Sequence, residues 1–341
     1  MNSSLKQLFL ENFKLCEVGH GQKVAVLSEG EELSDYREAS LMAASELGAT
    51  VLDANIPTET SVHVTERMAN IGQNSLKEHP EIMDACVHAD IVIDHMLLLF
   101  SREQIAMQKA GARVLLVVEP PEILDRLFPT QDLCRRVRAG EKHLGNAEIL
   151  RFTNDVGTDV TYRLGNSPIL TEYGFTSEPG RWDHWPGGFL ATLAKERGVN
   201  GRVVMNTGDI IYPLKRCLTA PVEFVIRDSV VVAINGGADA AILNSFMSSY
   251  KDSRAYAVSH IGWGLNADAK WSVNHPGIGM DGRAYCGNVL FSLGPDTEFG
   301  GSNDTSCHLD LPMRYCTLTL DGKIMVENGE IVPNDMRHTT F

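Results

Sequence analysis

Apolar segments alternate with amphipathic ones through the first third of the chain, and this alternation restricts the fold more than any other feature. The apolar, β-branched segments at 23–29, 50–56, 90–96 and 113–119 predict buried strands. Helical periodicity appears between them, for example in DYREASLMAASELGA at 35–49. Strands that alternate with helices are typical of βαβ units. The pattern therefore predicts an α/β N-terminal domain with a parallel sheet.

The first predicted strand is not followed by the glycine-rich motif of a dinucleotide site. Its end reads LSEGEEL, with one glycine and three glutamates. Carboxylates at that position would repel a pyrophosphate, and no GxGxxG is present there. We therefore predict no dinucleotide cofactor.

The second half of the chain is rich in strand and turn signals. EILRFTNDVGTDVTYRL at 148–164 predicts a hairpin around NDVG, and CTLTLDGKIMVENGEIV at 316–332 predicts another around Asp321-Gly322. A helix is predicted at 238–250. We therefore expect an α+β, strand-rich C-terminal domain over 141–341, after an N-terminal domain over 1–140.

Charge and apolar content limit the partners and the location. The net charge is −14 and the pI about 5.2, which disfavours nucleic acid. The longest apolar run, MLLLF, is too short to span a bilayer, so no membrane partner is expected. The seven cysteines form no CxxC pair, which argues against a thiolate zinc site. Reduced thiols and the lack of a signal-peptide pattern favour a cytoplasmic protein.

The stretch SCHLDL contains the most informative pair of polar residues, His308 and Asp310. On a strand, residues two apart point to the same face, so both side chains would reach one ion. With one distant histidine they would form the set of two histidines and a carboxylate that favours Fe(II) and leaves coordination positions open. A strand with a surface histidine and a capping aspartate fits the same spacing, and the spacing alone does not separate the two interpretations.

The best distant histidine is His260, in AYAVSHIGWGLN. A strand-like run leads into it, and we expect it to enter a glycine-rich turn where it would be presented as a ligand. A histidine that is merely hydrogen-bonded within a turn is an equally good interpretation of these residues.

Two further groups are candidates for binding or catalysis. The segment EYGFTSEPGRWDHWPGG at 172–188 predicts a glycine-rich loop whose aromatic and polar side chains suit a small polar ring, and its candidates are Glu172, Phe175, Trp182 and His184. His95 ends the strand DIVID, and ligands of open α/β sheets bind at that end of the strands, so it is a candidate acid/base. The alternatives are a packed surface loop and a capping or core histidine.

Three blocks of the second half resemble the M29 metallo-aminopeptidases, the group that includes aminopeptidase T. The blocks are WPGGFLATL at 185–193, SHIGWGLN at 259–266 and GGSNDTSCHLD at 300–310. The resemblance covers most of the chain and implies an aminopeptidase T-like fold.

Two departures from the peptidase pattern concern its metal ligands. Phe189 stands where those enzymes have a glutamate after the paired glycines. In their pattern AE-x-G-x-G-x-N a second glutamate stands where this chain has His260, after Ser259. A two-metal hydrolytic centre needs such anionic oxygens to hold its cations close together. The residues that remain form a set for a single metal ion.

The altered set resembles the 2,5-dihydroxypyridine 5,6-dioxygenases, ring-cleaving enzymes of nicotinate degradation. The resemblance implies a mononuclear Fe(II), extradiol-type enzyme whose partners are a small aromatic substrate and O2, and whose product is N-formylmaleamate. It implies iron ligation by His260, His308 and Asp310. Glu172 and His184 would bind the polar edge of the ring, and His95 would transfer a proton. On physical grounds we expect Phe175, Trp182 and Trp185 to wall the pocket and limit water. The resemblance also implies a homo-oligomer, with a hexamer as the candidate assembly.

Three other functions are compatible with the sequence. The first is an M29-type aminopeptidase, against which Phe189 and His260 count. The second is a non-catalytic metal-binding or scaffold protein on a peptidase-like fold. The third is a dioxygenase that acts on another hydroxylated heteroaromatic ring, because a single pocket residue can change that choice.

Overall fold

The computed structural model describes residues 3–58, 62–274 and 277–338, which form two compact units. The first unit takes in Met1–Pro129, Glu172–Gly187 and Pro276–Ile278. The second takes in Thr130–Thr171, Gly188–His275 and Gly279–Phe341. Residue 140 lies within helix α7 (Gln131–Gly145), and the predicted domain boundary at that residue stays a prediction.

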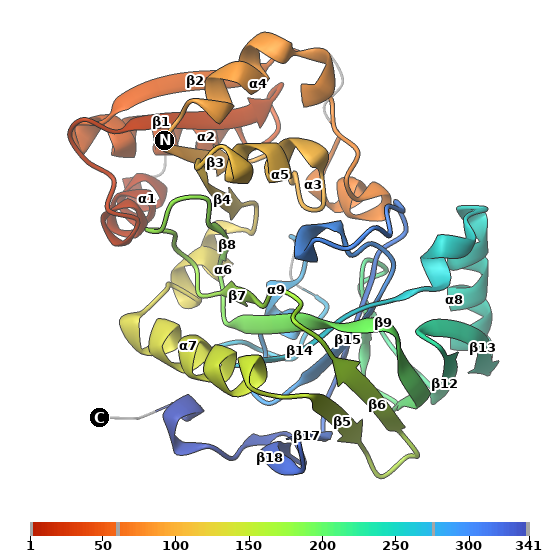
Figure 1. Ribbon diagram of the computed structural model, residues 1–341. Coiled ribbons are helices and arrows are strands. Elements are labelled where there is room, and N and C mark those ends of the chain that lie inside the picture. The colour runs from red at the N-terminus through yellow and green to blue at the C-terminus, as the bar shows by residue number, and fades with distance from the viewer. Residues whose placement is uncertain (1–2, 59–61, 275–276, 339–341) are drawn as a thin grey trace. The chain divides into compact units, whose positions relative to one another are not determined.

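A parallel sheet forms the centre of the first unit (Figure 1). Its strand order is β2-β1-β3-β4-β8, and every neighbouring pair is parallel. The bounds are β1 Lys23–Glu29, β2 Thr50–Ile56, β3 Ile91–Asp94, β4 Arg113–Val117 and β8 Trp182–Trp185. Residues of β3, β4 and β8 are all buried, as expected for a parallel sheet covered on both faces. The predicted α/β unit is confirmed.

Six α-helices accompany this sheet in the part of the unit that the structure describes. They are α1 Ser3–Leu15, α2 Ser34–Glu46, α3 Val64–Arg67, α4 Pro80–Val87, α5 Arg102–Lys109 and α6 Pro121–Arg126. Helix α5 starts at an N-cap serine: the Ser101 side chain accepts a hydrogen bond from the backbone N–H of Gln104.

The edge strand β8 corrects one expectation. We predicted that residues 172–188 form a glycine-rich loop, but Trp182–Trp185 pair with β4 as a fifth parallel strand. The tetrapeptide WDHW is fully buried, and a hydrogen-bonded strand supplies partners for its buried backbone groups. The prediction of a continuous loop was wrong: the glycines make turns on either side of the strand, with positive φ at Gly174 and Gly180 before it and at Gly188 after it.

Antiparallel strands dominate the second unit. The main path runs β16-β15-β14-β9-β6-β5-β17-β18-β19, and β7 and the β12–β13 hairpin also pair along the long strand β9. The first strands are β5 Ile149–Thr153, β6 Asp159–Leu164, β7 Leu170–Glu172, β9 Phe189–Met205, β10 Ile210–Ile211, β11 Arg216–Cys217, β12 Val222–Arg227 and β13 Val230–Gly236. The later strands are β14 Val258–Gly264, β15 Val289–Leu293, β16 Leu309–Met313, β17 Thr317–Leu320, β18 Lys323–Glu327 and β19 Glu330–Ile331.

The strand-rich second half is confirmed in detail. Both predicted hairpins form, as β5–β6 and β17–β18. The predicted helix at 238–250 is α8 (Ala238–Ser249), and α9 (Met280–Arg283) is a single turn. Helix α7 lies on β9, where a Cβ at Gly140 would come within 2.9 Å of the Leu190 side chain. The glycine allows this close approach.

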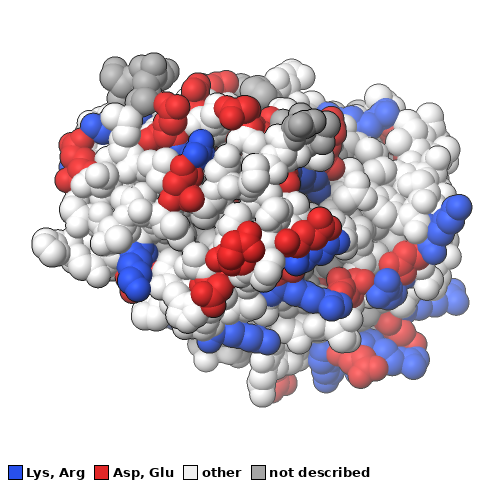
Figure 2. Space-filling view, turned by 90° about the horizontal axis from the view of Figure 1, so that it is seen from above, with Lys and Arg blue, Asp and Glu red and all other residues white. Residues whose placement is uncertain are grey.

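Charged residues of both signs are interspersed on the molecular face shown in Figure 2. Among the described residues of that face, blue and red side chains alternate without a continuous basic area. The described helices include none that is long and apolar enough to cross a membrane.

Candidate metal centre

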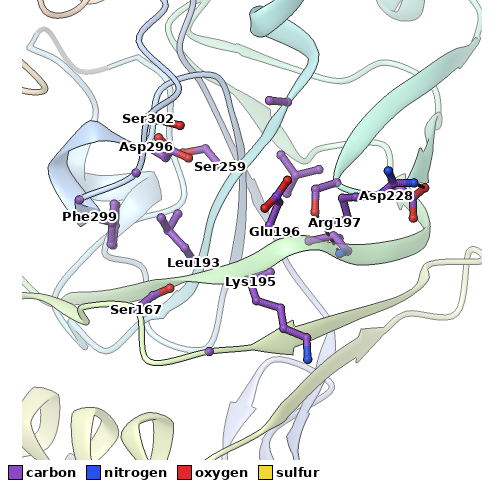
Figure 3. A pocket seen from close by; sticks show the side chains of 18 of the residues that line it. Ser167, Leu193, Lys195, Glu196, Arg197, Asp228, Ser259, Asp296, Phe299 and Ser302 are labelled. Atoms are coloured by element: carbon purple, nitrogen blue, oxygen red, sulfur yellow. Dashed lines mark hydrogen bonds and ion pairs between the residues drawn. The ribbon is translucent and has the colours of Figure 1, made fainter.

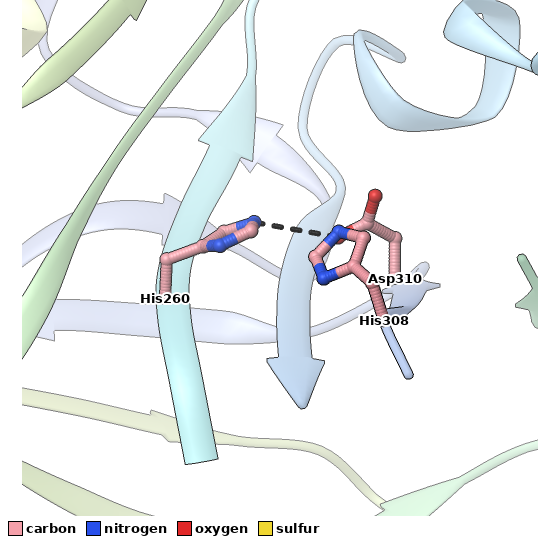
Figure 4. A group of neighbouring side chains, drawn as sticks. All are labelled: His260, His308 and Asp310. Carbon is pink, nitrogen blue, oxygen red and sulfur yellow. Dashed lines mark ion pairs between the residues drawn. The ribbon is translucent and has the colours of Figure 1, made fainter. Parts of the chain in front are cut away.

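His260, His308 and Asp310 come together in the second unit (Figure 4). One ligand atom from each lies within 4.8 Å of the other two. All three residues are buried, with exposed fractions of 5%, 2% and 5%. Their strands, β14 and β16, flank β15, so the side chains reach across the intervening strand.

Strand β16 places two of these side chains. His308 directly precedes the strand and Asp310 is its second residue. As strand alternation predicts, they face the same side, and His308 Nε2 lies 3.2 Å from Asp310 Oδ1. The backbone of Asp310 is fixed on both sides, by Ser292 of β15 and by two hydrogen bonds with Tyr212.

His260 is delivered by a β-bulge rather than by a turn. We expected a glycine-rich turn after AYAVS, but residues 258–264 form β14. In the pairing with β15, Val258 opposes Leu293 and Ile261 opposes Phe291, so Ser259 and His260 together face one residue. Bulges of this kind redirect side chains. Here His260 Nε2 lies 3.3 Å from Asp310 Oδ1.

The donor atoms fit one metal ion. Two ligands about 2.1 Å from an ion and at right angles to each other are about 3.0 Å apart. The separations of 3.2 and 3.3 Å from Asp310 Oδ1 to the two Nε2 atoms are close to that value. Asp310 Oδ1 is buried, and no described residue gives it a hydrogen bond of acceptable geometry. A cation between the three atoms would satisfy this oxygen.

Arg283 is hydrogen-bonded to the other oxygen of the Asp310 carboxylate, Oδ2. Its Nε donates a hydrogen bond of 2.6 Å to Asp310 Oδ2, and its guanidinium lies 4.3 Å from the centre of the Tyr212 ring. Helix α9 approaches this ring closely because Gly279 and Gly282 lack side chains; a Cβ at Gly279 would be 2.2 Å from the ring. No motif in the sequence predicts Arg283 as a site residue. The only signal was the glycine pattern of GIGMDGR before it.

Electrostatics favour an ionised Asp310 and a neutral His260. Burial would raise the pKa of Asp310, but its contacts with His308 and Arg283 outweigh burial and hold that pKa well below its usual range. Burial lowers the pKa of His260 despite the opposing effect of Asp310. An ionised carboxylate beside a neutral imidazole is what a metal ion binds.

Aromatic residues enclose the His260 ring. Phe299, at the end of the 3₁₀ turn Thr297–Phe299, stacks on it with centroids 5.3 Å apart. Phe189 of β9 meets it edge-on at 6.2 Å. Both phenylalanines belong to a buried apolar cluster that includes Leu193 and Leu290. Phe189, which stands where the peptidase pattern has a glutamate, is therefore part of an apolar wall.

A cavity of about 680 Å³ opens beside this wall (Figure 3). Ser259 and Phe299 line it together with Asp296 and Ser302, whereas the three ligand residues do not. The cavity therefore reaches the residues that support His260, and it is distinct from the space between the ligand atoms.

His95 lies in the first unit, directly after β3, at the end of the strand where it was predicted. Its Nδ1 lies 2.7 Å from the Val117 carbonyl oxygen, and its Nε2 lies 3.0 Å from Ser40 Oγ. Burial lowers its pKa to about 4. These contacts are those of the core-histidine alternative, and the proton-transfer role stays a prediction.

The four candidates for ring binding are also in the first unit and are buried: Glu172, Phe175, Trp182 and His184. The rings of Trp182 and His184, both on β8, are 6.3 Å apart. Trp182 Nε1 is buried and finds no hydrogen-bond partner among the described residues. Asp183 between them accepts hydrogen bonds from the backbone N–H groups of Tyr173 and Gly174, which closes the segment on itself.

Comparison with known proteins decides the family. A family model described as 2,5-dihydroxypyridine 5,6-dioxygenase matches residues 4–333. The 2,5-dihydroxypyridine 5,6-dioxygenase of Pseudomonas putida KT2440 is 40% identical over 346 residues, which cover 98% of each chain. The chain belongs to the 2,5-dihydroxypyridine 5,6-dioxygenase family. The predicted resemblance is confirmed, and the chain is an enzyme of the dioxygenase class.

Solved structures support the same assignment. The structure of 2,5-dihydroxypyridine dioxygenase from Pseudomonas putida KT2440 superposes on this dioxygenase with a TM-score of 0.94 at 40% identity, covering 99% of both chains. AmpT from Thermus thermophilus gives a TM-score of 0.63 at 14% identity, covering 97% of this chain and 99% of AmpT. The second likeness concerns the fold alone and confirms the aminopeptidase T-like architecture. Family and histidine–aspartate cluster together indicate a metal cofactor.

Proposed function

We propose that this dioxygenase opens the ring of 2,5-dihydroxypyridine with O2 to give N-formylmaleamate. Both oxygen atoms enter the product, so the reaction needs no external reductant. The observation that carries the proposal is the buried convergence of His260, His308 and Asp310 in a chain of this family.

We propose Fe(II) as the metal, bound by His260 Nε2, His308 Nε2 and Asp310 Oδ1. Two imidazoles and one carboxylate are the donor set that favours Fe(II) and leaves positions open. When bound, the ion would bring the ring hydroxyl and O2 together and carry electron density between them. Arg283 holds Asp310 Oδ2, so the carboxylate presents its other oxygen to the site.

Substrate contacts are assigned to the first unit. We propose that Glu172 and His184 bind the polar edge of the ring, and that Phe175 and Trp182 wall the pocket. The buried indole N–H of Trp182, which has no partner among the described residues, supports a contact with a polar group. Burial of all four side chains would limit the access of water.

We assign proton transfer to His95. Removing the proton of the ring hydroxyl favours binding as an anion, and a neutral imidazole accepts a proton. Support comes from its position at the carboxyl end of β3 and from its lowered pKa of about 4, which keeps the ring neutral near pH 7. Ser40 and Val117 hold the ring by one nitrogen each.

The hydrolytic alternative has less support. A second metal ion at the peptidase position would need anionic oxygens, but Phe189 and its neighbours Leu193 and Leu290 form an apolar cluster there. A single metal ion per chain is the expected stoichiometry.

The direct test is anaerobic reconstitution with Fe(II) followed by addition of 2,5-dihydroxypyridine and oxygen. We expect equimolar loss of oxygen and of substrate absorbance. His308→Ala should abolish both, whereas His88→Ala, which changes an exposed histidine of the first unit, should not. Folded, Fe(II)-loaded protein that consumes no oxygen would contradict the proposed substrate. Turnover of leucine p-nitroanilide with an added divalent metal would favour the peptidase.

We further propose a cytoplasmic location and a homo-oligomeric state. All seven cysteines are free in the structure, which agrees with a reducing compartment. The oligomeric state is measured by analytical ultracentrifugation of the metal-loaded protein, and a hexamer is the assembly that the resemblance implies.

A further inference from the structure

The bulge in β14 places the side chains of Ser259 and His260 next to each other. Neighbouring residues of a regular strand point to opposite faces. At the bulge two residues oppose one, and Ser259 Oγ lies 3.3 Å from His260 Nδ1. Both side chains are buried. The serine hydroxyl is therefore in position to contact the imidazole nitrogen that does not face Asp310.

The direction of the hydroxyl proton follows from its second contact. Ser259 Oγ is also hydrogen-bonded to the carbonyl oxygen of Pro295, which has no proton and only accepts. The hydroxyl therefore donates to Pro295, and its lone pairs face His260 Nδ1. A neutral imidazole has one N–H. The contact favours the form that carries this proton on Nδ1, which leaves the lone pair of Nε2 directed toward Asp310 Oδ1.

We propose that Ser259 is a positioning residue that selects the metal-binding tautomer of His260. The inference rests on the proposed function only in that His260 binds the metal. Metal-binding histidines usually donate their second N–H to a fixed acceptor, and loss of that acceptor weakens metal binding. The segment that carries Pro295 also carries Phe299, whose ring stacks on His260. One segment thus fixes both the hydroxyl and the plane of the imidazole.

Selection of the His260 tautomer by Ser259 gives a physical reason why both positions differ from the peptidase pattern. That pattern places alanine before a glutamate where this chain has Ser259 and His260. The two oxygens of an ionised carboxylate are equivalent and need no proton fixed elsewhere. An imidazole has two unlike nitrogens, so a neighbouring acceptor matters once histidine replaces glutamate.

The test measures Co(II) binding to metal-free protein, by the visible absorbance of the complex and by competition with a chelator. Ser259→Ala should weaken Co(II) binding about 10- to 100-fold. Ser259→Thr keeps the hydroxyl and should bind nearly as tightly as the parent protein. Ser259→Cys, a weak acceptor of similar shape, should fall between them and serves if the alanine variant does not fold.

Thr158→Ala is the matched control. Thr158 is buried in the second unit away from the ligand residues, and its hydroxyl donates to the Val204 carbonyl oxygen at 2.9 Å. It should lose comparable stability and keep its Co(II) affinity. Equal weakening in both alanine variants, or unchanged affinity in folded Ser259→Ala and Ser259→Cys, would overturn the proposal.

The same experiment separates this inference from the proposed function. If the parent protein binds Co(II) with the expected dependence on Ser259 but its Fe(II) form consumes no oxygen with 2,5-dihydroxypyridine, only the substrate assignment fails. If the parent protein binds no Co(II), the role of Ser259 fails as well.

Discussion

At the scale of single residues, Asp310 divides its two oxygens between different partners. Oδ2 is held by Arg283, while Oδ1 lies close to the two imidazole nitrogens. The stacking of Arg283 on Tyr212 fixes the guanidinium, so the carboxylate cannot rotate without losing this hydrogen bond. Orientation of a ligand by its neighbours is a large part of metal affinity.

Removal of the arginine side chain should weaken the metal centre. We expect Arg283→Gln to lower metal affinity about 10- to 100-fold, because Asp310 loses its charged partner. Arg216→Gln is the control, since Arg216 forms a similar 2.6 Å ion pair with buried Asp239 away from the ligand residues. Isothermal titration of the metal-free variants with Co(II) gives the comparison. Equal affinities of Arg283→Gln and the parent protein would contradict the role.

The lowered pKa of buried His95 predicts that the stability of the protein depends on pH. The folded pKa of His95, about 4, lies below the ordinary value of 6.5, so the unfolded chain binds more protons between these values. The stability that its neutral form contributes is complete above pH 6.5 and is lost as pH falls toward 4, by about 3 kcal/mol. The difference in free energy of unfolding between the parent protein and His95→Gln, measured with urea, should therefore grow by about 3 kcal/mol in favour of the parent as pH rises from 4 to 6.5.

The control for this measurement is His88→Gln, which changes an exposed histidine and should keep the parent profile. Comparison of variant with parent also cancels the opposite contribution of Asp94, whose pKa burial raises to about 6. A difference between His95→Gln and the parent protein that stays constant from pH 4 to pH 6.5 would show that His95 is not the titrating group.

At the scale of elements, the sequence predicts regular structure better than the irregularities that build the site. The alternation of apolar and amphipathic segments was enough to predict β1 to β4. The alternation of side chains along a strand was enough to predict the shared face of His308 and Asp310. The bulge at Ser259 was not predictable, because it depends on which strand pairs with β14. Arg283 was missed for a similar reason: its helix has one turn, and its place depends on glycines that fit against Tyr212.

A substitution at Gly262 would test whether the metal centre needs the close spacing of β14 and β9. A Cβ at this position would lie 1.9 Å from the Leu190 carbonyl oxygen. Gly262→Ala should therefore separate the two strands and lower the free energy of unfolding by about 1–3 kcal/mol, with weaker metal binding through His260. Chemical denaturation measures the first effect and metal titration the second.

Gly19→Ala is the control, because a Cβ there comes no closer than 4.0 Å to another atom, the Leu47 carbonyl oxygen. Its stability and metal affinity should stay near those of the parent protein. Parent-like behaviour of Gly262→Ala would mean that the strands tolerate a wider spacing.

At the scale of the whole molecule, metal binding should stabilise the fold. A ligand that binds only the folded state adds about 2.7 kcal/mol at a free concentration of 100 times its dissociation constant. We expect Fe(II) or Co(II) to raise the thermal midpoint, a chelator to reverse the shift, and His308→Ala to show none. Metal analysis should find one ion per chain. Two ions per chain, or a shift that persists in His308→Ala, would contradict the mononuclear centre.

The path of the chain through β8 has a consequence for synthesis. The parallel sheet draws its first four strands from residues before 118 and its fifth from Trp182–Trp185, after a long stretch that belongs to the second unit. During translation, the edge of β4 that later pairs with β8 therefore stays unpaired while that stretch is synthesised. A polypeptide cut at residue 140 would never receive its last strand, and its open edge would invite aggregation. The sheet is complete only when the ribosome has passed the midpoint of the message.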